Sequence, residues 1–173
     1  MSNNILVTGS PGSGKTTLIE KLVNPIPDKK GFVTREIRKS GRRTGFEIIT
    51  SDGERKLLAG IDIDSPYRVS KYKVDVRGFE VVIDRFFTFS NQDVLYIDEI
   101  GKMELFSDGF RKLVRLYLEA DNLFIATIAL KATDTFIDEV KQRKDVQIFT
   151  IDHGNRNTVY SKLANYLKEN RYG

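Results

Sequence analysis

The stretch Ile5-Leu6-Val7-Thr8-Gly9-Ser10-Pro11-Gly12-Ser13-Gly14-Lys15-Thr16-Thr17 decides how the rest of the chain is interpreted. It begins with three apolar residues, which are typical of a short buried strand, and continues as a glycine-rich loop. Apolar residues at helical spacing follow the loop, namely Leu18, Ile19 and Leu22. The loop fits the pattern G-x-x-x-x-G-K-[ST] between a strand and a helix, which is the context this pattern requires. The sequence therefore predicts a loop that binds phosphate groups.

Each residue type in this loop has a physical reason. Glycine lets the backbone approach a phosphate closely, because it has no Cβ atom to clash. Backbone N–H groups and the N-terminus of the following helix then form an anion site. Lys15 can reach the β- and γ-phosphates, and the Thr16 hydroxyl can bind Mg²⁺. The residues that we expect to bind the nucleotide here are Gly9, Ser10, Pro11, Gly12, Ser13, Gly14, Lys15, Thr16 and Thr17.

The composition narrows the class of protein. The chain has 173 residues, of which 40% are hydrophobic and 30% charged, so we expect one globular domain over residues 1–173. It has no cysteine, which excludes disulfides, thiolate metal sites and a cysteine nucleophile. His153 is the single histidine, which argues against a histidine metal site or a Ser-His-Asp triad. The net charge of +4 suits a polyanionic ligand but is too small to indicate nucleic acid by itself.

The sequence shows no feature of a membrane or secreted protein. No apolar run approaches the roughly 18 residues of a membrane-spanning helix. The segment Met1-Ser2-Asn3-Asn4 lacks the basic flank of a signal peptide and leads directly into the first strand. We therefore expect a cytoplasmic protein without a membrane segment, and we expect it to be a monomer.

Strand patterns alternate with helical patterns over the second half of the chain. In order, the periodicity predicts a helix around 79–87, a strand at 94–98, a helix at 110–118, a strand at 123–128, a helix around 136–140, a strand at 147–151 and a helix at 159–167. Such alternation predicts βαβ units, and hence an α/β P-loop fold with a mostly parallel sheet flanked by helices. Ligands bind at the carboxyl ends of such strands, where both Gly9 and Asp98 fall.

Residues 31–60 follow a different pattern. Residues 31–38 and 44–50 each alternate as strands do, and Ser40-Gly41-Arg42 provides a turn between them. A second turn signal, Ser51-Asp52-Gly53, precedes another apolar run. We therefore expect an antiparallel hairpin or meander inserted into the α/β chain.

A second motif supplies two carboxylates. The apolar run that starts at Val94 ends in Asp98 and Glu99, which is the Walker B pattern when it lies downstream of a phosphate loop. Asp98 and Thr16 are the residues that we expect to hold Mg²⁺. Glu99 is expected to orient or deprotonate the attacking water, and both carboxylates belong to the predicted nucleotide site. An acidic residue directly after the metal-binding aspartate favours hydrolysis over phosphate transfer to a bound acceptor.

Several longer segments together carry a resemblance over nearly the whole chain. They are Gly14-Lys15-Thr16-Thr17, Gly31-Phe32-Val33-Thr34-Arg35-Glu36, Arg43-Thr44-Gly45-Phe46, Asn155-Arg156 and, above all, Asp98-Glu99-Ile100-Gly101-Lys102-Met103-Glu104-Leu105. With these segments the chain resembles the small P-loop nucleoside-triphosphatase family of thermophiles, whose human relative is called cancer-related nucleoside-triphosphatase. The resemblance implies slow, Mg²⁺-dependent hydrolysis of ATP, GTP and other nucleoside triphosphates to NDP and phosphate, with broad base specificity.

Other residues are candidates for the same site. Arginines could stabilise the charge on the transferring phosphoryl group, and those available are Arg35, Arg38, Arg42, Arg43, Arg143 and Arg156. We favour Arg156 and Arg35, and predict Glu99, Lys15 and Arg156 as the catalytic set. Glu104 could serve the site or favour a helix start through the helix dipole, and Lys102 could face phosphate or solvent. Tyr72 could stack on a base.

Two alternative functions stay open at this point. A nucleotide or nucleoside kinase could use the same phosphate loop, with residues 31–76 holding an acceptor. A nucleotide-dependent switch or nucleic-acid adaptor is a second alternative, because the predicted hairpin is rich in basic residues, namely Arg35, Arg38, Lys39, Arg42 and Arg43. A solvated surface is the simpler interpretation of those charges.

Overall fold

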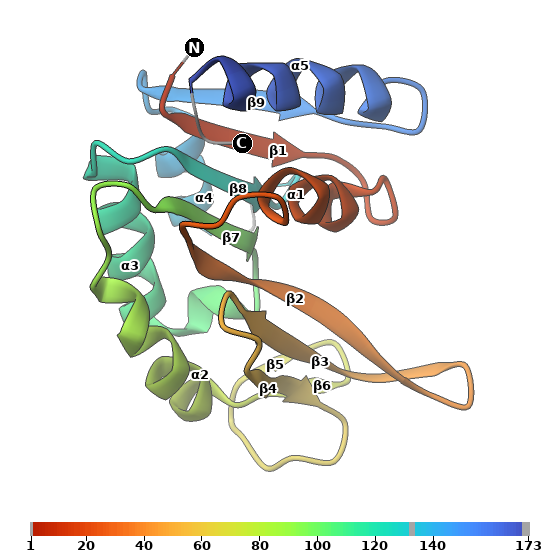
Figure 1. The fold of residues 1–173 in the computed structure, drawn as a ribbon. Coiled ribbons are helices and arrows are strands. Elements are labelled where there is room, and N and C mark those ends of the chain that lie inside the picture. Colours follow the sequence, from red (N-terminus) through yellow and green to blue (C-terminus); the bar gives the residue numbers. More distant parts are fainter. Residues whose placement is uncertain (1, 132–133, 171–173) are drawn as a thin grey trace.

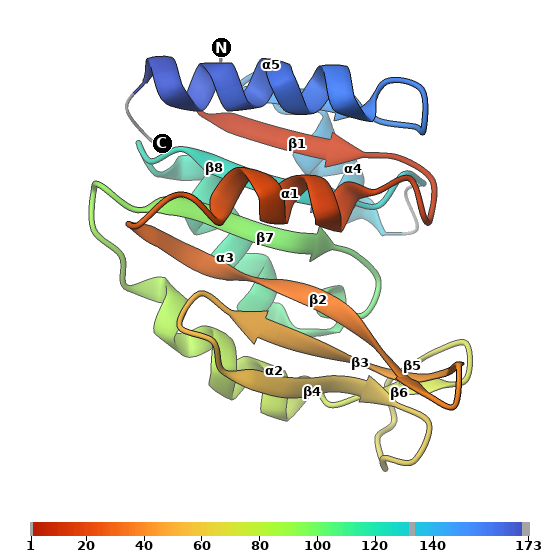
Figure 2. The ribbon, with the colours of Figure 1, turned by 45° about the vertical axis from the view of Figure 1, so that its right-hand side comes forward.

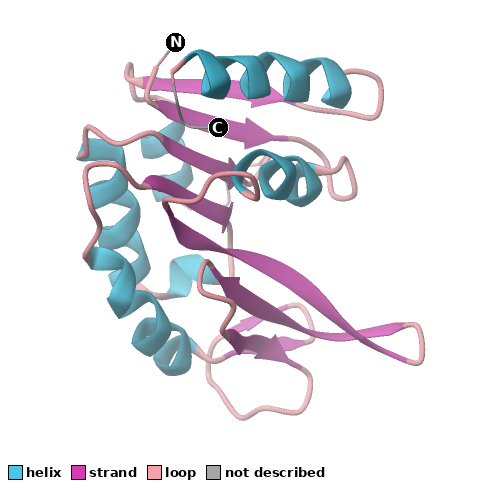
Figure 3. Ribbon diagram, in the orientation of Figure 1, coloured by secondary structure: helices cyan, strands magenta, loops and turns pink. Residues whose placement is uncertain are grey.

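One mixed sheet organises the protein. A computed structural model describes residues 2–131 and 134–170, and within them nine strands form a sheet of order β5-β6-β4-β3-β2-β7-β8-β1-β9 (Figures 1 and 3). The strands are β1 (Asn4–Thr8), β2 (Lys29–Lys39), β3 (Arg42–Thr50), β4 (Arg55–Gly60), β5 (Arg68–Val69), β6 (Tyr72–Val74), β7 (Val94–Ile100), β8 (Phe124–Ile128) and β9 (Val146–Thr150). The helices are α1 (Lys15–Val23), α2 (Val76–Ile83), α3 (Asp108–Glu119), α4 (Thr135–Lys141) and α5 (Arg156–Glu169), with 3₁₀ turns η1 (Asp84–Phe87) and η2 (Glu104–Phe106).

The predicted parallel sheet is confirmed. Among the described residues, strands β2, β7, β8, β1 and β9 pair side by side in parallel. Strand β1 lies between β8 and β9, with Leu6 opposite Ala126 on one side and Ile148 on the other. Every residue of β1 and β8 is buried, which explains why both read as continuous runs rather than alternating ones.

Two hydrophobic cores lie on opposite faces of this sheet. Successive side chains of a strand point to opposite faces, so Leu6 packs in one core while Ile5 and Val7 pack in the other. The first core includes the apolar faces of α2, α3 and α4, and the second includes those of α1 and α5. Figure 2 shows α1 and α5 in front of the sheet, with α3 and α4 behind it. The result is the expected layered α/β arrangement.

The predicted hairpin is present, but it continues the main sheet rather than standing apart from it. The first part of β2, Lys29–Val33, pairs in parallel with β7, and the strand pairs antiparallel with β3 from Phe32 to Lys39. Strands β4, β6 and β5 then extend the antiparallel half. The tip of the β2–β3 hairpin projects on the side where the arrows of β1 and β7 end (Figure 1). One long strand therefore connects the parallel half to the hairpin.

Helix starts follow local capping. Ser107 caps α3, since its hydroxyl accepts a hydrogen bond from the Phe110 N–H at 2.9 Å. Helix α2 starts earlier than the apolar spacing predicts, because the Asp75 carboxylate accepts from the Gly78 N–H at 2.9 Å. None of the helices in the described part of the chain combines the length and apolar character that crossing a membrane requires.

Candidate active site

The start of α1 is left open for an anion. Gly14 occupies the N-cap position with φ of 97°, a left-handed conformation that favours glycine. No described side chain caps this end, and the first turn carries no acidic residue. The first N–H groups of α1 are therefore available to a negatively charged ligand, which the helix dipole also favours.

A cavity of about 770 Å³ opens in front of the loop. Of the predicted loop residues, those that line it are Gly9, Ser10, Pro11, Gly12, Lys15 and Thr16. Ser13, Gly14 and Thr17 are not among the described lining residues. Ser13 is buried, Arg156 lies over Gly14, and Thr17 is exposed on α1. The loop thus presents two thirds of its predicted residues to one space.

Lys15 is held close to the loop that precedes it. Its Nζ donates hydrogen bonds to the Gly9 carbonyl at 3.0 Å and the Ser10 carbonyl at 3.4 Å. The positive charge therefore lies over the concave side of the loop, where a phosphate chain would rest.

Asp98 is fixed by two hydroxyl groups from different elements. Thr16 at the start of α1 donates to Asp98 Oδ2 at 2.7 Å, and Thr127 of β8 donates to Asp98 Oδ1. Burial raises the pKa of Asp98, while these two hydrogen bonds and the Lys15 charge oppose that shift. The two predicted metal ligands, Thr16 and Asp98, are thus in direct contact. A hydroxyl and a carboxylate are oxygen donors of the kind that Mg²⁺ prefers.

Glu99 follows Asp98 on β7 and lines the same cavity. Burial raises the pKa of its carboxyl group, and Asp98 adds to that shift while Lys15 opposes it. A Cβ atom placed on Gly101 would lie 2.7 Å from Glu99 Oε1 and 3.2 Å from Glu104 Oε2. Both glutamates therefore crowd the same glycine.

Glu104 belongs to the cavity wall rather than to the surface. It lies at the start of η2, is only 4% exposed and lines the cavity. Thr34 of β2 donates a hydrogen bond to Glu104 Oε1 at 3.3 Å. Burial, with the nearby charge of Glu99, raises the pKa of Glu104 to about 8. Of the two roles that the sequence leaves open for Glu104, the structure favours the site.

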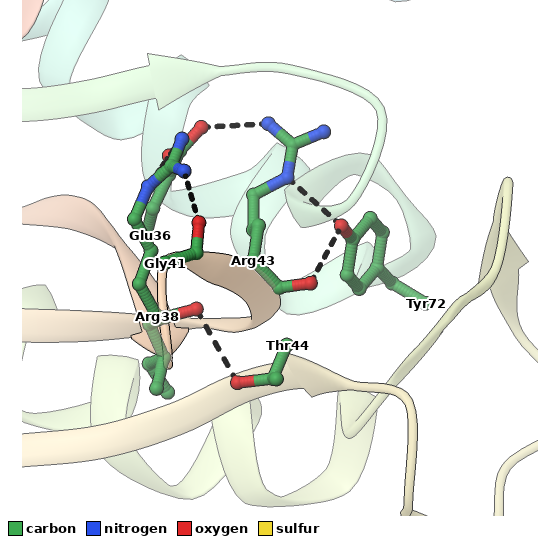
Figure 4. Close-up of polar contacts among 7 residues, drawn as sticks. Glu36, Arg38, Gly41, Arg43, Thr44 and Tyr72 are labelled. Carbon is green, nitrogen blue, oxygen red and sulfur yellow. Dashed lines mark hydrogen bonds and ion pairs between the residues drawn. The ribbon is translucent and has the colours of Figure 1, made fainter.

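Figure 4 shows a polar cluster at the hairpin, of which Glu36 and Arg43 line the cavity. Arg43 donates from Nη1 to Glu36 Oε1 at 2.6 Å and from Nε to the Tyr72 hydroxyl at 2.9 Å. Its guanidinium carbon also lies 5.2 Å from the centre of the Phe46 ring. Tyr72 is 3% exposed and packs against Phe46, so it is not free to stack on a base.

The remaining arginine candidates are distributed unevenly. Arg156, the first residue of α5, places Nη1 at 3.3 Å from the position a Gly14 Cβ would take, so it lies beside the phosphate loop. Arg35 forms an ion pair with Glu20, and Arg143 pairs with Asp145 at 2.7 Å. None of these three is among the described residues that line the cavity.

The basic hairpin residues are partly neutralised. Arg38 and Arg43 share the Glu36 carboxylate, each at 2.6 Å. Arg35 forms an ion pair with Glu20, a residue of α1. Three of the five basic side chains behind the nucleic-acid alternative therefore already have acidic partners.

Sequence reasoning did not assign two threonines to the site, Thr34 and Thr127. Thr34 and Thr127 come from β2 and β8, and each donates its hydroxyl hydrogen to a buried carboxyl group. Thr127 offers a weak signal, because it is a hydroxyl within the apolar run Leu123-Phe124-Ile125-Ala126-Thr127-Ile128. Thr34 lies in Gly31-Phe32-Val33-Thr34-Arg35-Glu36, one of the segments that carry the family resemblance, but its residue type gives no sign of this contact, because threonine is common in strands.

Known proteins are similar to this chain over nearly its whole length. The NTPase family model matches residues 4–164. The nucleoside-triphosphatase THEP1 of Thermotoga sp. (strain RQ2) is 45% identical over 171 residues, covering 96% of this chain and 97% of that protein. The crystal structure of THEP1 from the hyperthermophile Aquifex aeolicus matches with a TM-score of 0.85 at 34% identity, covering 95% of this chain and 98% of that one.

The human relative extends the comparison beyond thermophiles. The solution structure of a human cancer-related nucleoside triphosphatase matches with a TM-score of 0.80 at 34% identity, covering 96% of this chain and 97% of that one. The resemblance stated from the sequence motifs is thereby confirmed. With a family match over most of its length and relatives this similar from end to end, the chain belongs to the NTPase family.

Proposed function

We propose that this protein hydrolyses the bond between the β- and γ-phosphates of nucleoside triphosphates, with Mg²⁺. One observation carries the proposal: the uncapped start of α1, Lys15, the Thr16–Asp98 pair and Glu99 all meet at one cavity. Relatives in Thermotoga and in humans are named nucleoside-triphosphatases, which supports nucleoside-triphosphate hydrolysis as the reaction.

Each part of the site has a place in this reaction. A water oxygen attacks the γ-phosphorus in line, the bond from that phosphorus to the β–γ bridging oxygen breaks, and NDP leaves. Glu99 takes the proton of the water, and burial brings its pKa closer to neutral pH, as a general base requires. Lys15 and the amides of residues 12–16 neutralise the charge that develops on the phosphates.

Thr16 and Asp98 are the residues that would hold the metal ion. Two oxygen ligands from the protein are enough, because Mg²⁺ usually takes its other ligands from substrate phosphates and water. When bound, Mg²⁺ would neutralise negative charge on the β- and γ-phosphates. Arg156 would add positive charge from the Gly14 side of the loop. We also infer slow turnover and broad base specificity, and the second of these agrees with relatives named for nucleoside triphosphates in general.

The substitution Glu99→Gln tests the proposed base. It removes the group that takes the proton but leaves the loop and the metal pair, so Mg·ATP binding should persist while phosphate release falls by about 100-fold or more. Lys15→Ala is the contrasting variant, and it should lose both binding and turnover. Binding is measured by titration with a fluorescent ATP analogue, and turnover by phosphate release. Wild-type turnover in Glu99→Gln would exclude Glu99 as the base.

The extent of the cavity favours one second candidate, phosphate transfer to a small acceptor. Beyond the carboxylates, the cavity continues to residues of the hairpin and its neighbours, such as Thr34, Phe46 and Val69. An acceptor in that space would compete with water for the γ-phosphate. Incubation with ATP and a panel of nucleosides and NMPs, followed by chromatography, separates the two functions. Hydrolysis predicts inorganic phosphate as the phosphoryl product in every mixture.

A further inference from the structure

Glu104 is a buried carboxyl group that the reaction described above does not use. It lies in the wall of the same cavity at 4% exposure. Among the described side chains, only that of Thr34 forms a hydrogen bond with Glu104, and it donates to Oε1 at 3.3 Å. No described lysine, arginine or histidine places a side-chain nitrogen within 4.0 Å of its carboxyl oxygens. Such a position is unfavourable for a carboxyl group unless it has a function.

A purely structural reason for Glu104 is weak. A glutamate at the start of a helix gains from the helix dipole, but η2 is a single 3₁₀ turn of three residues, Glu104–Phe106. The core beside it accepts apolar side chains, since Leu105 is buried and Met103 packs against the same cluster. A leucine or methionine would fill this space at lower cost than a carboxyl group.

The location of Glu104 relative to Glu99 supplies the reason that packing does not. The point where a Gly101 Cβ would lie is 2.7 Å from Glu99 Oε1 and 3.2 Å from Glu104 Oε2. The two carboxyl groups therefore face the same small region beside the glycine. These two distances place Glu99 Oε1 and Glu104 Oε2 no more than about 6 Å apart, close enough for one water molecule near the glycine to contact both carboxyl groups. Thr34 of β2 anchors Glu104 through its other carboxyl oxygen, Oε1.

We propose that Glu104 is a positioning residue for hydrolysis: anchored by Thr34, its carboxyl group holds the Glu99 carboxyl group and the attacking water in the orientation for attack. The inference rests on the proposed function, because it assigns Glu99 as the base. It extends the catalytic machinery from β7 to η2 and β2, which lie outside the phosphate loop and the Asp98–Glu99 pair.

The surroundings of Glu104 indicate which form of the carboxyl group does this. Burial and the neighbouring Glu99 raise the pKa of Glu104 to about 8, so the neutral acid predominates near pH 7 and can donate a hydrogen bond. The charged groups that share the cavity or act on it are Lys15 of α1, Asp98 and Glu99 of β7, Lys102 before η2, Glu36 and Arg43 of the hairpin, and Lys131 after β8.

The kinetic test compares three substitutions by steady-state phosphate release with Mg·ATP. Glu104→Leu removes both hydrogen-bonding oxygens, so kcat should fall about tenfold or more while KM changes less than about twofold, since ground-state binding is untouched. Glu104→Gln keeps a neutral donor and acceptor, and should retain kcat within about threefold. Thr34→Val removes only the anchor and should give an intermediate loss in kcat.

A pH profile separates positioning from simple packing. In the wild type, kcat should fall above about pH 8, where Glu104 ionises and brings a second negative charge to Glu99. Glu104→Gln should lack that decline, because an amide does not ionise. Wild-type kcat in Glu104→Leu would overturn the proposal. So would equal losses in the Leu and Gln variants together with an unchanged alkaline decline in Glu104→Gln.

Failure of this inference is distinguishable from failure of the proposed function. If Glu99→Gln loses turnover while Glu104→Leu keeps it, only the role of Glu104 is excluded. If Glu99→Gln keeps turnover, the base assignment itself is excluded. Thermal melting of each variant checks that it is folded. Should Glu104→Leu fail to fold, the kcat and pH profile of Glu104→Gln still decide the question.

Discussion

At the scale of single residues, Gly101 determines how much room the Glu99 side chain has. An added Cβ atom would lie 2.7 Å from Glu99 Oε1 and 2.9 Å from Glu99 Cγ, closer than such atoms can approach. Gly101→Ala must therefore displace Glu99. Displacement of a reacting group by about 1 Å can cost about 100-fold in rate, so we expect kcat to fall about 10- to 100-fold with KM nearly unchanged.

The matched control for this substitution is Gly60→Ala. Gly60 lies at the end of β4, and the atom nearest to an added Cβ is 3.7 Å away, which is an ordinary contact. Steady-state kinetics of both variants, with melting temperatures, provide the comparison. A Gly101→Ala enzyme with the kcat of Gly60→Ala would show that Glu99 has room to move without loss.

Some residues of the site could be predicted from the sequence and others could not. The loop residues, Asp98 and Glu99 were predictable, because each motif is a short continuous segment whose spacing is set by one strand and the turn after it. Thr34 and Thr127 were not, because their contacts depend on which strands become neighbours. Thr127 meets Asp98 only since β8 lies between β7 and β1.

At the scale of elements, the cap of α3 joins two helices. The Ser107 side chain is fully buried, accepts from the Phe110 N–H at 2.9 Å and donates to Glu80 Oε1 of α2 at 2.7 Å. Ser107→Ala removes the cap and leaves Glu80 without that donor. The expected loss in the free energy of unfolding is about 1–2 kcal/mol.

Urea denaturation followed by circular dichroism measures this loss. Ser90→Ala is the control, because Ser90 is exposed and its hydroxyl accepts only a 3.3 Å hydrogen bond from the Gln92 N–H. We expect a change within about 0.5 kcal/mol for that variant. Equal stability of the two variants would mean that water replaces the cap of α3 at no cost.

Periodicity predicted the long elements and missed those defined by their partners. Residues 110–118 repeat their apolar side chains at helical spacing, so α3 was recognisable before any contact was known. Strands β5 and β6 have two and three residues, too few for a pattern to show. They exist because β6 pairs with β4 through Ala59 and Gly60, and β5 pairs in turn with β6.

At the scale of the whole molecule, strand order creates the site. The order β7-β8-β1 places the Walker B strand two positions from the phosphate loop, with Thr127 of β8 between them. Strand β2 on the other side of β7 then brings Thr34 and the hairpin over the cavity. Hydropathy patterns identify strands but carry no information on their order, so this arrangement was not available from periodicity.

The same arrangement gathers carboxyl groups in a buried place, which makes the stability of the whole molecule depend on pH. Burial raises the pKa of Asp98, Glu99 and Glu104, the last to about 8 against a usual value near 4.5. The folded state therefore binds more protons than the unfolded state between those two values. Stability must fall as pH rises through this range. Carboxyl groups with a lowered pKa, such as Asp134 with a pKa of about 2, change the stability only at pH values below this range.

We therefore expect the metal-free, nucleotide-free protein to be more stable at pH 5.5 than at pH 8. Glu104 alone should lower the free energy of unfolding by roughly 1 kcal/mol for each pH unit in that interval. Glu104→Gln carries no ionisable group there, so its urea midpoint should change less between the two pH values than that of the wild type. Equal pH dependence in both proteins would mean that Glu104 ionises at its ordinary pH in the folded chain. Asp98, Glu99 and Glu104 all line the cavity, so the loss of stability at higher pH follows directly from the burial of carboxyl groups in the site.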